Sequence, residues 1–584
     1  MERSVLGKAW RLRTCDEGAV LAIGQRLGLA DITARVLAGR GLALGDVEGY
    51  LEPRLKDWLP DPSHLLDLDV AAERVARAVA GAERVGLIGD YDVDGATSTA
   101  LVGRYLRSLG VEVEVEIPDR LTDGYGPNAE ALGRLAAAGC RLVLTLDSGT
   151  TAFEALAAGR RLGLEVVVVD HHAAEAELPE ALAVVNPNRQ DQASPLKHLA
   201  AVGVAFVLLV AVGRALRAAG YFAGRAEPSL LDRLDLVALG TVCDVVPLTG
   251  LNRAFVHQGL KVARRGGTVG LDALAHVAGL AELGKARDFG FVLGPRLNAG
   301  SRTGRSTLAA RLLLTDDASE AAGLAERLHE LNGQRQATER LVLEAAEREA
   351  AEQARAGLPV LVVAGEGWHQ GVVGIVASRL VERYYRPAFV IGLDAGIGKG
   401  SARSVGGFDI GAAVIEARHR GLLLKGGGHA MAAGLTVEAG SLAAFAAFVR
   451  ERHAAASGGA APEPEPLDLD AALSVGALGT PLALEVERMA PFGAGNQEPR
   501  FGLADARLVE AKPVGDGHVS CMLAGPAGGG RTKAIAFRVG GTPLAQALLR
   551  GSGGGAVCLA GRLRVDRYRN REQASFQIED AVVD

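Results

Sequence analysis

The chain has 584 residues, a formal net charge of −6 at pH 7 and 48% hydrophobic residues, enough apolar material for several buried cores. Its five cysteines are widely spaced, which argues against a disulfide framework and a cysteine-based zinc site. Because the overall charge is acidic, any affinity for nucleic acid must come from local basic surface.

No signal-peptide pattern stands at the N-terminus, and the longest apolar run, 199–213, is shorter than the roughly 20 residues of a membrane span. A buried helix beside a sheet is expected there. We therefore expect a cytoplasmic protein with no membrane segment.

The first part of the chain is expected to be helical over residues 1–75. Over 76–315, aliphatic runs alternate with alanine-rich stretches, which predicts βαβ units around a parallel sheet. Residues 111–117 alternate strictly between Val or Ile and Glu, which indicates an edge strand with one face in water.

Acidic residues follow the first strand of this region. Asp90, Asp92 and Asp94 come after the apolar run 85–89. Carboxylates at alternate positions repel one another unless a cation lies between them, and Mg²⁺ and Mn²⁺ favour such oxygen ligands. The alternative is an exposed acidic turn.

Two further aliphatic runs also end in candidate ligands. One is followed by Asp147, and the other by Asp170, His171 and His172. Continuous runs of this kind are typical of parallel strands buried on both faces, and the carboxyl ends of such strands form the ligand-binding edge of the sheet. We therefore expect these residues to converge. Asp244, within another apolar run, also needs a partner.

The number of candidate ligands indicates the chemistry. Four to six carboxylates with imidazole exceed what one metal can use while it also holds substrate. Two ions about 3.5–4 Å apart that share a carboxylate would use them all and would activate water for attack on phosphorus. The sequence thus predicts metal-assisted hydrolysis of a phosphoester or phosphoanhydride, and the histidines favour Mn²⁺ over Mg²⁺.

The remaining chain divides by composition. Residues 316–356 are expected to form a long connecting helix, with a solvated surface helix as the alternative, and 357–455 a second, smaller α/β domain. Residues 456–466 are rich in Pro and Gly and predict a linker. Short strands and Gly-rich turns within 467–584 predict a small barrel of the OB type.

The predicted barrel carries a basic cluster. On a strand, alternate arginines share one face, and a groove of positive charge with an aromatic platform is how OB barrels bind single strands. The alternative is a soluble hairpin with a charged tip. The candidate DNA-binding residues are Arg562, Arg564, Arg567, Tyr568 and Arg569.

At the acidic motifs the sequence resembles the DHH phosphoesterase superfamily, and within it the RecJ family of exonucleases. The matching motifs are 90–95, 147–149, Asp170-His171-His172 and Asp244. The resemblance continues along nearly the whole chain, through segments 118–120, 124–126, 294–299, 368–379, 401–404, 426–429 and 491–496. One departure is Ser301, where the family more often has Gly before the arginine.

The resemblance implies an α/β fold: a parallel-sheet DHH domain, a connecting helix, a DHH-associated domain and an OB-like barrel. It implies a single-stranded-DNA-specific 5′→3′ exonuclease that releases 5′-mononucleotides with two Mn²⁺ or Mg²⁺ ions. DNA recombination and repair, a helicase and a single-strand-binding protein as partners, and a monomeric state are further expectations.

The resemblance also implies residue roles. Asp147 would bridge the two ions, with Asp92 on one, and Asp90 is a weaker candidate ligand. The second ion would be held by Asp94, His171 and Asp244, and the catalytic His172 would lie beside the scissile phosphate. The implied substrate-binding residues are Arg120, Arg296, Asn298, Arg302, Ser401, Arg403, Gly428 and His429.

Two other functions remain open at this stage. One is a DHH hydrolase of short oligonucleotides, pyrophosphate or polyphosphate, which would not require the long helix and the barrel. The other is a catalytically inactive replication scaffold, which the fully occupied metal motifs disfavour.

Overall fold

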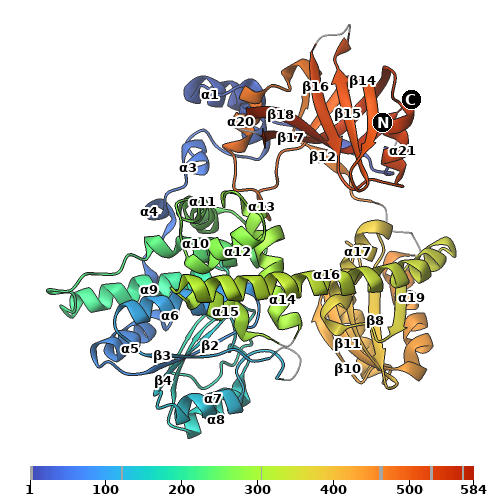
Figure 1. Cartoon of the computed structure of the whole chain (residues 1–584). Coiled ribbons are helices and arrows are strands. Elements are labelled where there is room, and N and C mark those ends of the chain that lie inside the picture. The colour runs from blue at the N-terminus through green and yellow to red at the C-terminus, as the bar shows by residue number, and fades with distance from the viewer. Residues whose placement is uncertain are drawn as a thin grey trace.

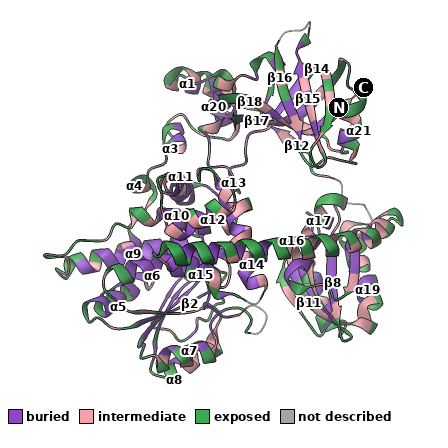
Figure 2. Cartoon of the chain, in the orientation of Figure 1, coloured by how far each residue is buried: buried purple, intermediate pink, exposed green. Residues whose placement is uncertain are grey.

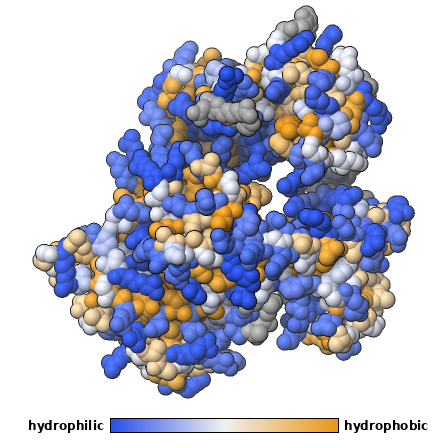
Figure 3. All heavy atoms as spheres, viewed as in Figure 1, coloured by the Kyte–Doolittle hydropathy of each residue, from blue (hydrophilic) through white to orange (hydrophobic). Residues whose placement is uncertain are grey.

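The computed structural model of the chain describes residues 4–119, 123–303, 305–458, 464–526, 530–568 and 571–583. It has three lobes, and the long helix α16 (Ala318–Arg355) runs from the first lobe to the second (Figure 1). The third lobe is a β-barrel, and an opening separates it from the second lobe on the face seen in Figure 3.

The first lobe contains a five-stranded, fully parallel sheet in the order β3-β2-β4-β5-β6. The predicted parallel sheet is confirmed, and so is the edge position of the alternating segment, which forms β3. The strands are β2 (Val85–Gly89), β3 (Val113–Glu116), β4 (Leu142–Leu146), β5 (Glu165–Val169) and β6 (Ala183–Val185).

Helices cover both faces of this sheet, and all residues of β2 and β4 are consequently buried (Figure 2). The helices on one face are α7 (Ala129–Ala137) and α8 (Phe153–Arg161). The other face and its extension carry α5 (Leu68–Ala80), α6 (Val93–Ser108), α9 (Ala201–Ala218), α10 (Leu234–Cys243), α11 (Gly250–Arg264), α12 (Val269–Val277), α14 (Gly294–Arg302) and α15 (Thr307–Leu314).

The apolar run near residue 200 forms α9, the one helix within the described residues that is long and apolar enough to cross a membrane. It is 72% buried inside the protein and packs against α5 and α6. Its apolar surface is therefore covered by the core of the first lobe, as expected for a helix beside the sheet.

The predicted long helix is confirmed as α16, which at 38 residues extends about 57 Å. Its first half packs on α12 and α14, and its second half packs on the second lobe. That lobe has a mixed sheet in the order β10-β11-β9-β8-β7. Its elements are β7 (Leu361–Glu366), α17 (Gln370–Tyr384), β8 (Ala388–Asp394), β9 (Ile397–Arg403), α18 (Ile410–His419), β10 (Lys425–His429), β11 (Ala432–Glu438) and α19 (Leu442–Ser457).

The C-terminal barrel has the strand order β13-β14-β15-β16-β18-β17, and pairing of β14 with β17 closes it. The predicted OB-type barrel is thus confirmed. Its elements are β13 (Ala471–Leu473), β14 (Phe501–Val514), β15 (His518–Ala524), β16 (Arg531–Ala536), α21 (Pro543–Arg550), β17 (Gly555–Tyr568) and β18 (Arg571–Val583).

The N-terminal residues differ from the single helical lead-in expected for 1–75. They begin with a strand, β1 (Trp10–Leu12), which pairs with β12 (Leu467–Leu469) beside the barrel. The helices α1 (Glu17–Leu27), α2 (Asp31–Gly39) and α3 (Val47–Leu51) contribute to the hydrophobic core of the barrel. The N-terminal segment therefore belongs with the C-terminal domain, because its apolar side chains complete that core.

A buried arginine joins the first lobe to the barrel. Arg253 of α11 is 3% exposed, and its guanidinium donates to the carbonyls of Tyr50, Met489, Ala490 and Pro491 at 2.8–3.3 Å. It also lies over the Tyr50 ring, 3.9 Å from the centroid. The segment 491–496, quoted above as a motif, therefore forms part of the contact between two lobes.

We expect Arg253→Met to lower the free energy of unfolding by about 3 kcal/mol, because it leaves several buried carbonyls without a donor. Calorimetry of the full chain would measure the shift. The matched control is Arg160→Met, whose parent side chain is exposed and paired only with Glu180. Equal stability of the two variants would contradict the role assigned to Arg253.

Candidate metal centre

The carboxyl ends of three neighbouring strands bring the acidic residues together. The backbone N–H groups of Asp90, Asp147 and Asp170 donate to carbonyls of the adjacent strands at 3.0–3.1 Å. Each acid therefore continues the sheet by one residue. Because the three strands are parallel neighbours, their side chains emerge at one edge of the sheet.

Asp94 is placed by two helices. It lies in the first turn of α6, and its carboxylate accepts hydrogen bonds from Ala201 N–H at 2.6 Å and Val202 N–H at 3.0 Å, at the start of α9. The positive end of the α9 dipole thus faces a negative group. Gly95 allows the first turn of α6 to pack closely against the backbone of Asp90, since a Cβ at position 95 would lie 2.4 Å from the Asp90 carbonyl oxygen.

Two residues of the cluster region have unusual backbone angles. Asp147 has φ 64° and Val245, directly after Asp244, has φ 61°. Non-glycine residues rarely adopt this left-handed conformation, and for a β-branched residue it is a true outlier. Such strain is retained when the surrounding structure enforces it, and it is concentrated at functional sites.

His171 faces three carboxylates. Its Nδ1 lies 2.9 Å from the Leu199 carbonyl, which directs Nε2 inward. Nε2 is 3.4 Å from Asp147 Oδ1, 3.7 Å from Asp244 Oδ2 and 3.9 Å from Asp94 Oδ2. Among the described residues, His171 Nε2, Asp147 Oδ1 and Asp244 Oδ2 are buried without a hydrogen-bond partner. Buried polar atoms need a partner, and a divalent cation would satisfy all three.

The donor atoms form overlapping groups, each with atoms within 4.8 Å of one another. The three groups are Asp90, Asp92 and Asp147; Asp94, His171 and Asp244; and Asp147, His171 and His172. Asp147 and His171 each belong to two of them. All seven candidate metal and catalytic residues named from the sequence are thus brought together, and the oxygen and imidazole donors suit Mn²⁺ or Mg²⁺.

Without a cation, burial and mutual repulsion raise the pKa values of three of the acids. Burial and then the charge of Asp244 raise the pKa of Asp94 to about 7. Burial and then Asp92 raise the pKa of Asp244 to about 7. Burial and the neighbouring acids raise the pKa of Asp147 well above its ordinary value.

Asp170 differs from the other acids because hydrogen bonds occupy its carboxylate. Oδ1 accepts from the backbone N–H of His171 at 2.7 Å and lies 2.7 Å from Nδ1 of His172, and Oδ2 accepts from Thr150 N–H at 3.1 Å. These bonds outweigh burial and keep the pKa of Asp170 below its usual range. Asp170 therefore orients His172.

His172 is half-exposed beside the cluster. Burial lowers its pKa, but Asp170 and the other acids outweigh that effect and raise it to about 9. The hydroxyl of Tyr125 lies 3.1 Å from His172 Nδ1 and donates to the Asp147 carbonyl at 2.9 Å. The sequence did not predict the contact of Tyr125 with His172. Its only signal was that Tyr125 lies in the matching segment 124–126.

The second lobe brings three of the predicted substrate-binding residues into one region. Across the sheet, Arg403 of β9 pairs with Ala432 of β11, which pairs with His429 of β10. Ser401 and Arg403 both lie against Gly374 of α17, where a Cβ would meet each of them at 3.4 Å. Gly428 has φ 159°, and a Cβ there would lie 2.4 Å from the Ala432 carbonyl, so the position requires glycine.

Two of the predicted substrate-binding residues on α14, Arg296 and Arg302, make hydrogen bonds within the protein. Arg296 donates to the Val292 carbonyl at 2.7 Å and lies 3.3 Å from His329, and burial lowers its pKa. Arg302 donates to the Gly371 carbonyl at 2.8 Å and so ties the first lobe to the second. Asn298 lies between them, half-buried. Arg120 is outside the described residues.

The arginines of the barrel cluster are paired with acids. Arg562 pairs with Glu498 and Glu579, Arg564 pairs with Glu498, and Arg567 pairs with Glu487 at 2.6 Å and Glu572 at 3.0 Å. The intervening Leu563 and Val565 are buried, as expected for the opposite face of the strand. The pairing supports a structural role for these arginines, and their contact with DNA stays a prediction. The Tyr568 side chain and Arg569 lie outside the described part.

A second basic face lies on β15 and β16. Arg531 and Lys533 are exposed and have no ion pair among the described residues. Phe537 is 48% exposed and packs edge-on against His518, with ring centroids 5.3 Å apart. In OB barrels the second and third strands bind oligonucleotides, and these are the second and third long strands of this barrel.

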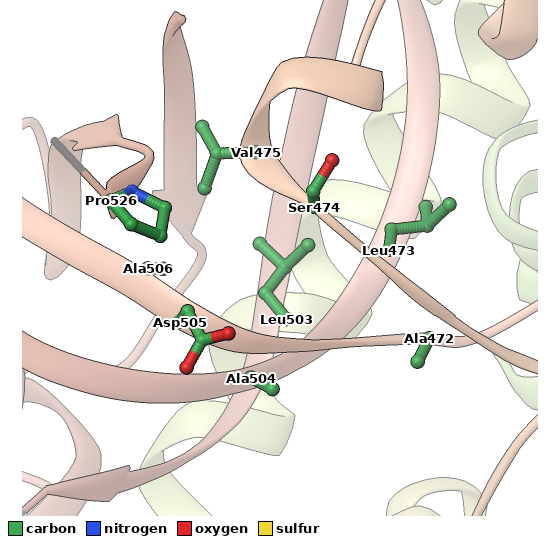
Figure 4. A pocket seen from close by; sticks show the side chains of 9 residues that line it. All are labelled: Ala472, Leu473, Ser474, Val475, Leu503, Ala504, Asp505, Ala506 and Pro526. Atoms are coloured by element: carbon green, nitrogen blue, oxygen red, sulfur yellow. The ribbon is translucent and has the colours of Figure 1, made fainter. Parts of the chain in front are cut away.

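The barrel also has a cavity of about 230 Å³ between β13 and β14. Small and apolar side chains line most of it, and Ser474 and Asp505 are the polar side chains labelled there (Figure 4). It lies in a different lobe from the acidic cluster and lacks groups for catalysis.

Three family models match the chain in the order of its lobes. The DHH family N-terminal domain matches residues 84–241, the DHHA1 domain matches 357–457, and the RecJ OB domain matches 469–580. The metal cluster, the Arg403 region and the barrel thus fall into separate family domains, except that Asp244 lies just beyond the first match.

The chain is also similar to known proteins over most of its length. It is 40% identical to the single-stranded-DNA-specific exonuclease RecJ of Dickeya dadantii, with 87% of this chain and 89% of that protein covered. The structure of RecJ from Thermus thermophilus in complex with Mn²⁺ matches with a TM-score of 0.80 and 32% identity, covering 99% of this chain and 80% of the other. The Mg²⁺ complex from that organism matches with a TM-score of 0.74 and 30% identity, covering 98% and 78%.

The raised carboxyl pKa values make the stability of the metal-free protein depend on pH. Because the folded protein holds protons that the unfolded chain has released, its stability should fall between pH 4 and pH 8 as Asp94 and Asp244 ionise, by about 4 kcal/mol or more. Asp147→Asn should melt higher than the parent at pH 8 without metal, and should gain less from Mn²⁺.

Melting temperatures in EDTA and in Mn²⁺ across this pH range would test the expectation. Asp505→Asn, which removes an exposed carboxylate in the barrel, is the control. A metal-free stability that is independent of pH would contradict the repulsion within the cluster.

Proposed function

This chain belongs to the RecJ family, and we propose that it removes nucleotides from the 5′ end of single-stranded DNA. It is a metal-dependent exonuclease specific for single-stranded DNA. The observation that carries this function is the cluster of acids and histidines at the strand ends, in a chain that matches a Mn²⁺-containing RecJ structure over 99% of its length.

The ligand assignment proposed from the sequence agrees with the distances. Asp147 would be shared by two ions, with Asp90 and Asp92 on one side and with Asp94, His171 and Asp244 on the other. Bound Mn²⁺ or Mg²⁺ supplies Lewis-acid activation of the attacking water and of the scissile phosphate. The carboxylates would hold the ions at the edge of the sheet.

His172 would act beside the phosphate. Asp170 holds its Nδ1, so the proton on Nε2 can face the substrate. The hydrogen bond and the charge of Asp170 favour the protonated imidazole, whose Nε2–H can donate to a phosphate oxygen on which negative charge develops. Asp170 would thus act through His172, by fixing its orientation and its charge.

The second lobe would select the 5′ end. Arg403, Ser401 and His429 offer a guanidinium fork, a hydroxyl and an imidazole within one region, which suits a terminal phosphate. Gly428, Arg120, Arg296, Asn298 and Arg302 complete the proposed path of the strand. Work beside a helicase and a single-strand-binding protein in recombination and repair, as a cytoplasmic monomer, is part of the same proposal.

Release of mononucleotides from 5′-labelled single-stranded and duplex DNA in Mn²⁺ tests the activity. Asp147→Ala should lower the rate on single strands by about 1,000-fold, equivalent to about 4 kcal/mol of lost transition-state stabilisation, while strand binding persists. Asp505→Asn should retain full activity. A normal rate for Asp147→Ala would contradict a shared metal ligand.

Polarity is tested with substrates that carry a 5′-phosphate or a 5′-hydroxyl. Arg403→Ala should reduce the preference for the phosphate by about tenfold or more, because the guanidinium fork is lost. Arg452→Ala, which removes an exposed arginine paired with Glu416, should keep the preference. An unchanged preference in Arg403→Ala would place the terminal phosphate elsewhere.

The salt dependence of strand binding distinguishes the two basic surfaces of the barrel. Each lost phosphate contact to a single strand lowers the slope of log K against log salt by about 0.7. Replacing Arg531 and Lys533 with Gln should lower it by about 1.4, whereas Arg567→Gln should not, because Arg567 is paired with acids. The reverse result would identify the arginine cluster as the contact surface.

A further inference from the structure

A groove of about 720 Å³ lies on the first lobe, away from the metal centre. It is bounded by the C-terminal half of α6, the edge strand β3 and α15, which lie beside one another (Figure 1). Since α6 begins at the metal centre, Asp94 and Arg107 are about 20 Å apart along the helix. The groove is therefore separate from the reacting groups.

Four guanidinium groups line the groove: Arg104, Arg107, Arg233 and Arg311. Two of them are held by the protein itself. Arg104 pairs with Asp316 and donates to the Leu313 and Thr315 carbonyls at 3.2 and 3.1 Å. Arg311 pairs with Glu320 at 2.8 Å. These contacts fix the wall of the groove and neutralise two of its positive charges.

The other two arginines have no direct ion pair in the described part of the chain. In the part of the chain that the structure describes, neither the Arg107 nor the Arg233 side chain makes a hydrogen bond or an ion pair within 4.0 Å. Arg233 is half-buried, and burial followed by the charge of Arg104 lowers its pKa, while Asp316, Asp235 and Asp232 act in the opposite direction without outweighing them. A cation in this position is costly unless an anion joins it.

The nearby acid on β3 does not supply that anion. Glu114 lines the rim of the groove, but strand alternation directs it to the same side as Glu116, which pairs with Arg134 of α7. The charge of Glu114 acts on Arg84, beyond the groove. Val113 and Val115 face the groove side of the strand and give it an apolar wall.

We propose that this groove binds a phosphomonoester, with the phosphate between Arg107 and Arg233 and an apolar part of the ligand against Val113 and Val115. A phosphate monoester carries a charge of about −1.5 to −2 at pH 7, which suits two guanidinium groups that have no direct ion pair. Its oxygens accept from forks that approach from two elements, here α6 and the turn that precedes α10. The volume is ample for a nucleoside monophosphate.

Binding would be measured by calorimetry on the full chain carrying Arg403→Ala, in EDTA. Under these conditions the metal centre holds no ion and the proposed 5′-phosphate pocket is weakened. Because the groove variants leave that pocket unchanged, a difference between them and the parent reports on the groove and is independent of the proposed function. Thymidine monophosphate should bind, and Arg107→Gln with Arg233→Gln should weaken binding by about tenfold or more. Arg107→Glu alone, at an exposed position, should weaken it without loss of the fold. Arg160→Gln should have no effect.

Two further ligands, 5′-phosphorylated (dT)10 and a hexaglutamate peptide, show whether the groove binds a free nucleotide, the end of a DNA strand or carboxylates of a protein. Tighter binding of the mononucleotide than of 5′-phosphorylated (dT)10 would indicate a free nucleotide, and the reverse order would indicate a strand end. Equal affinity of the parent and both groove variants for thymidine monophosphate would overturn the proposal. So would a hexaglutamate peptide that binds as tightly as the nucleotide and is lost in the same variants, because the groove would then recognise carboxylates of a protein.

Discussion

Repulsion between buried carboxylates is the constraint around which the first lobe is built. Asp94 and Asp147 are almost fully buried and lie close to Asp244. Unpaired charges in such a position are unstable, so protons or cations must compensate them. The fold limits the cost with the start of α9, whose N–H groups bind Asp94. The surrounding packing also enforces strained backbone conformations at Asp147 and Val245. The cluster is thus prepared for cations before they bind.

The contacts between the lobes involve residues close to the metal cluster. Leu248, four residues after Asp244, donates its N–H to the Ala494 carbonyl at 2.7 Å, in the segment that leads into the barrel. Arg302 connects α14 to the start of α17 in the second lobe. The surfaces proposed to hold DNA are therefore linked to the metal centre by short, hydrogen-bonded segments, and α16 sets the distance between the first two lobes.

Sequence reasoning succeeded where a local pattern determines the structure. Aliphatic runs ending in acids identified the strands and their shared edge, and a long charged stretch without proline identified α16. It did not succeed where partners are distant. The acids that pair with Arg562, Arg564 and Arg567 come from other segments, and no periodicity links His172 to Tyr125. The role of Asp170 in orienting His172 depends on four hydrogen bonds that only the folded chain displays.

The N-terminal segment has a consequence for biosynthesis. Val20, Ile23, Val36 and Leu37 are buried in the same core as Phe576 and Ile578, near the other end of the chain. During translation these four side chains emerge before the two lobes that lie between, and their partners emerge after them. The two lobes in between can form their own cores while the N-terminal helices still have exposed apolar faces. Such long-range pairing slows folding. It also leaves apolar surface exposed to chaperones until the ribosome has released the barrel strands that carry Phe576 and Ile578.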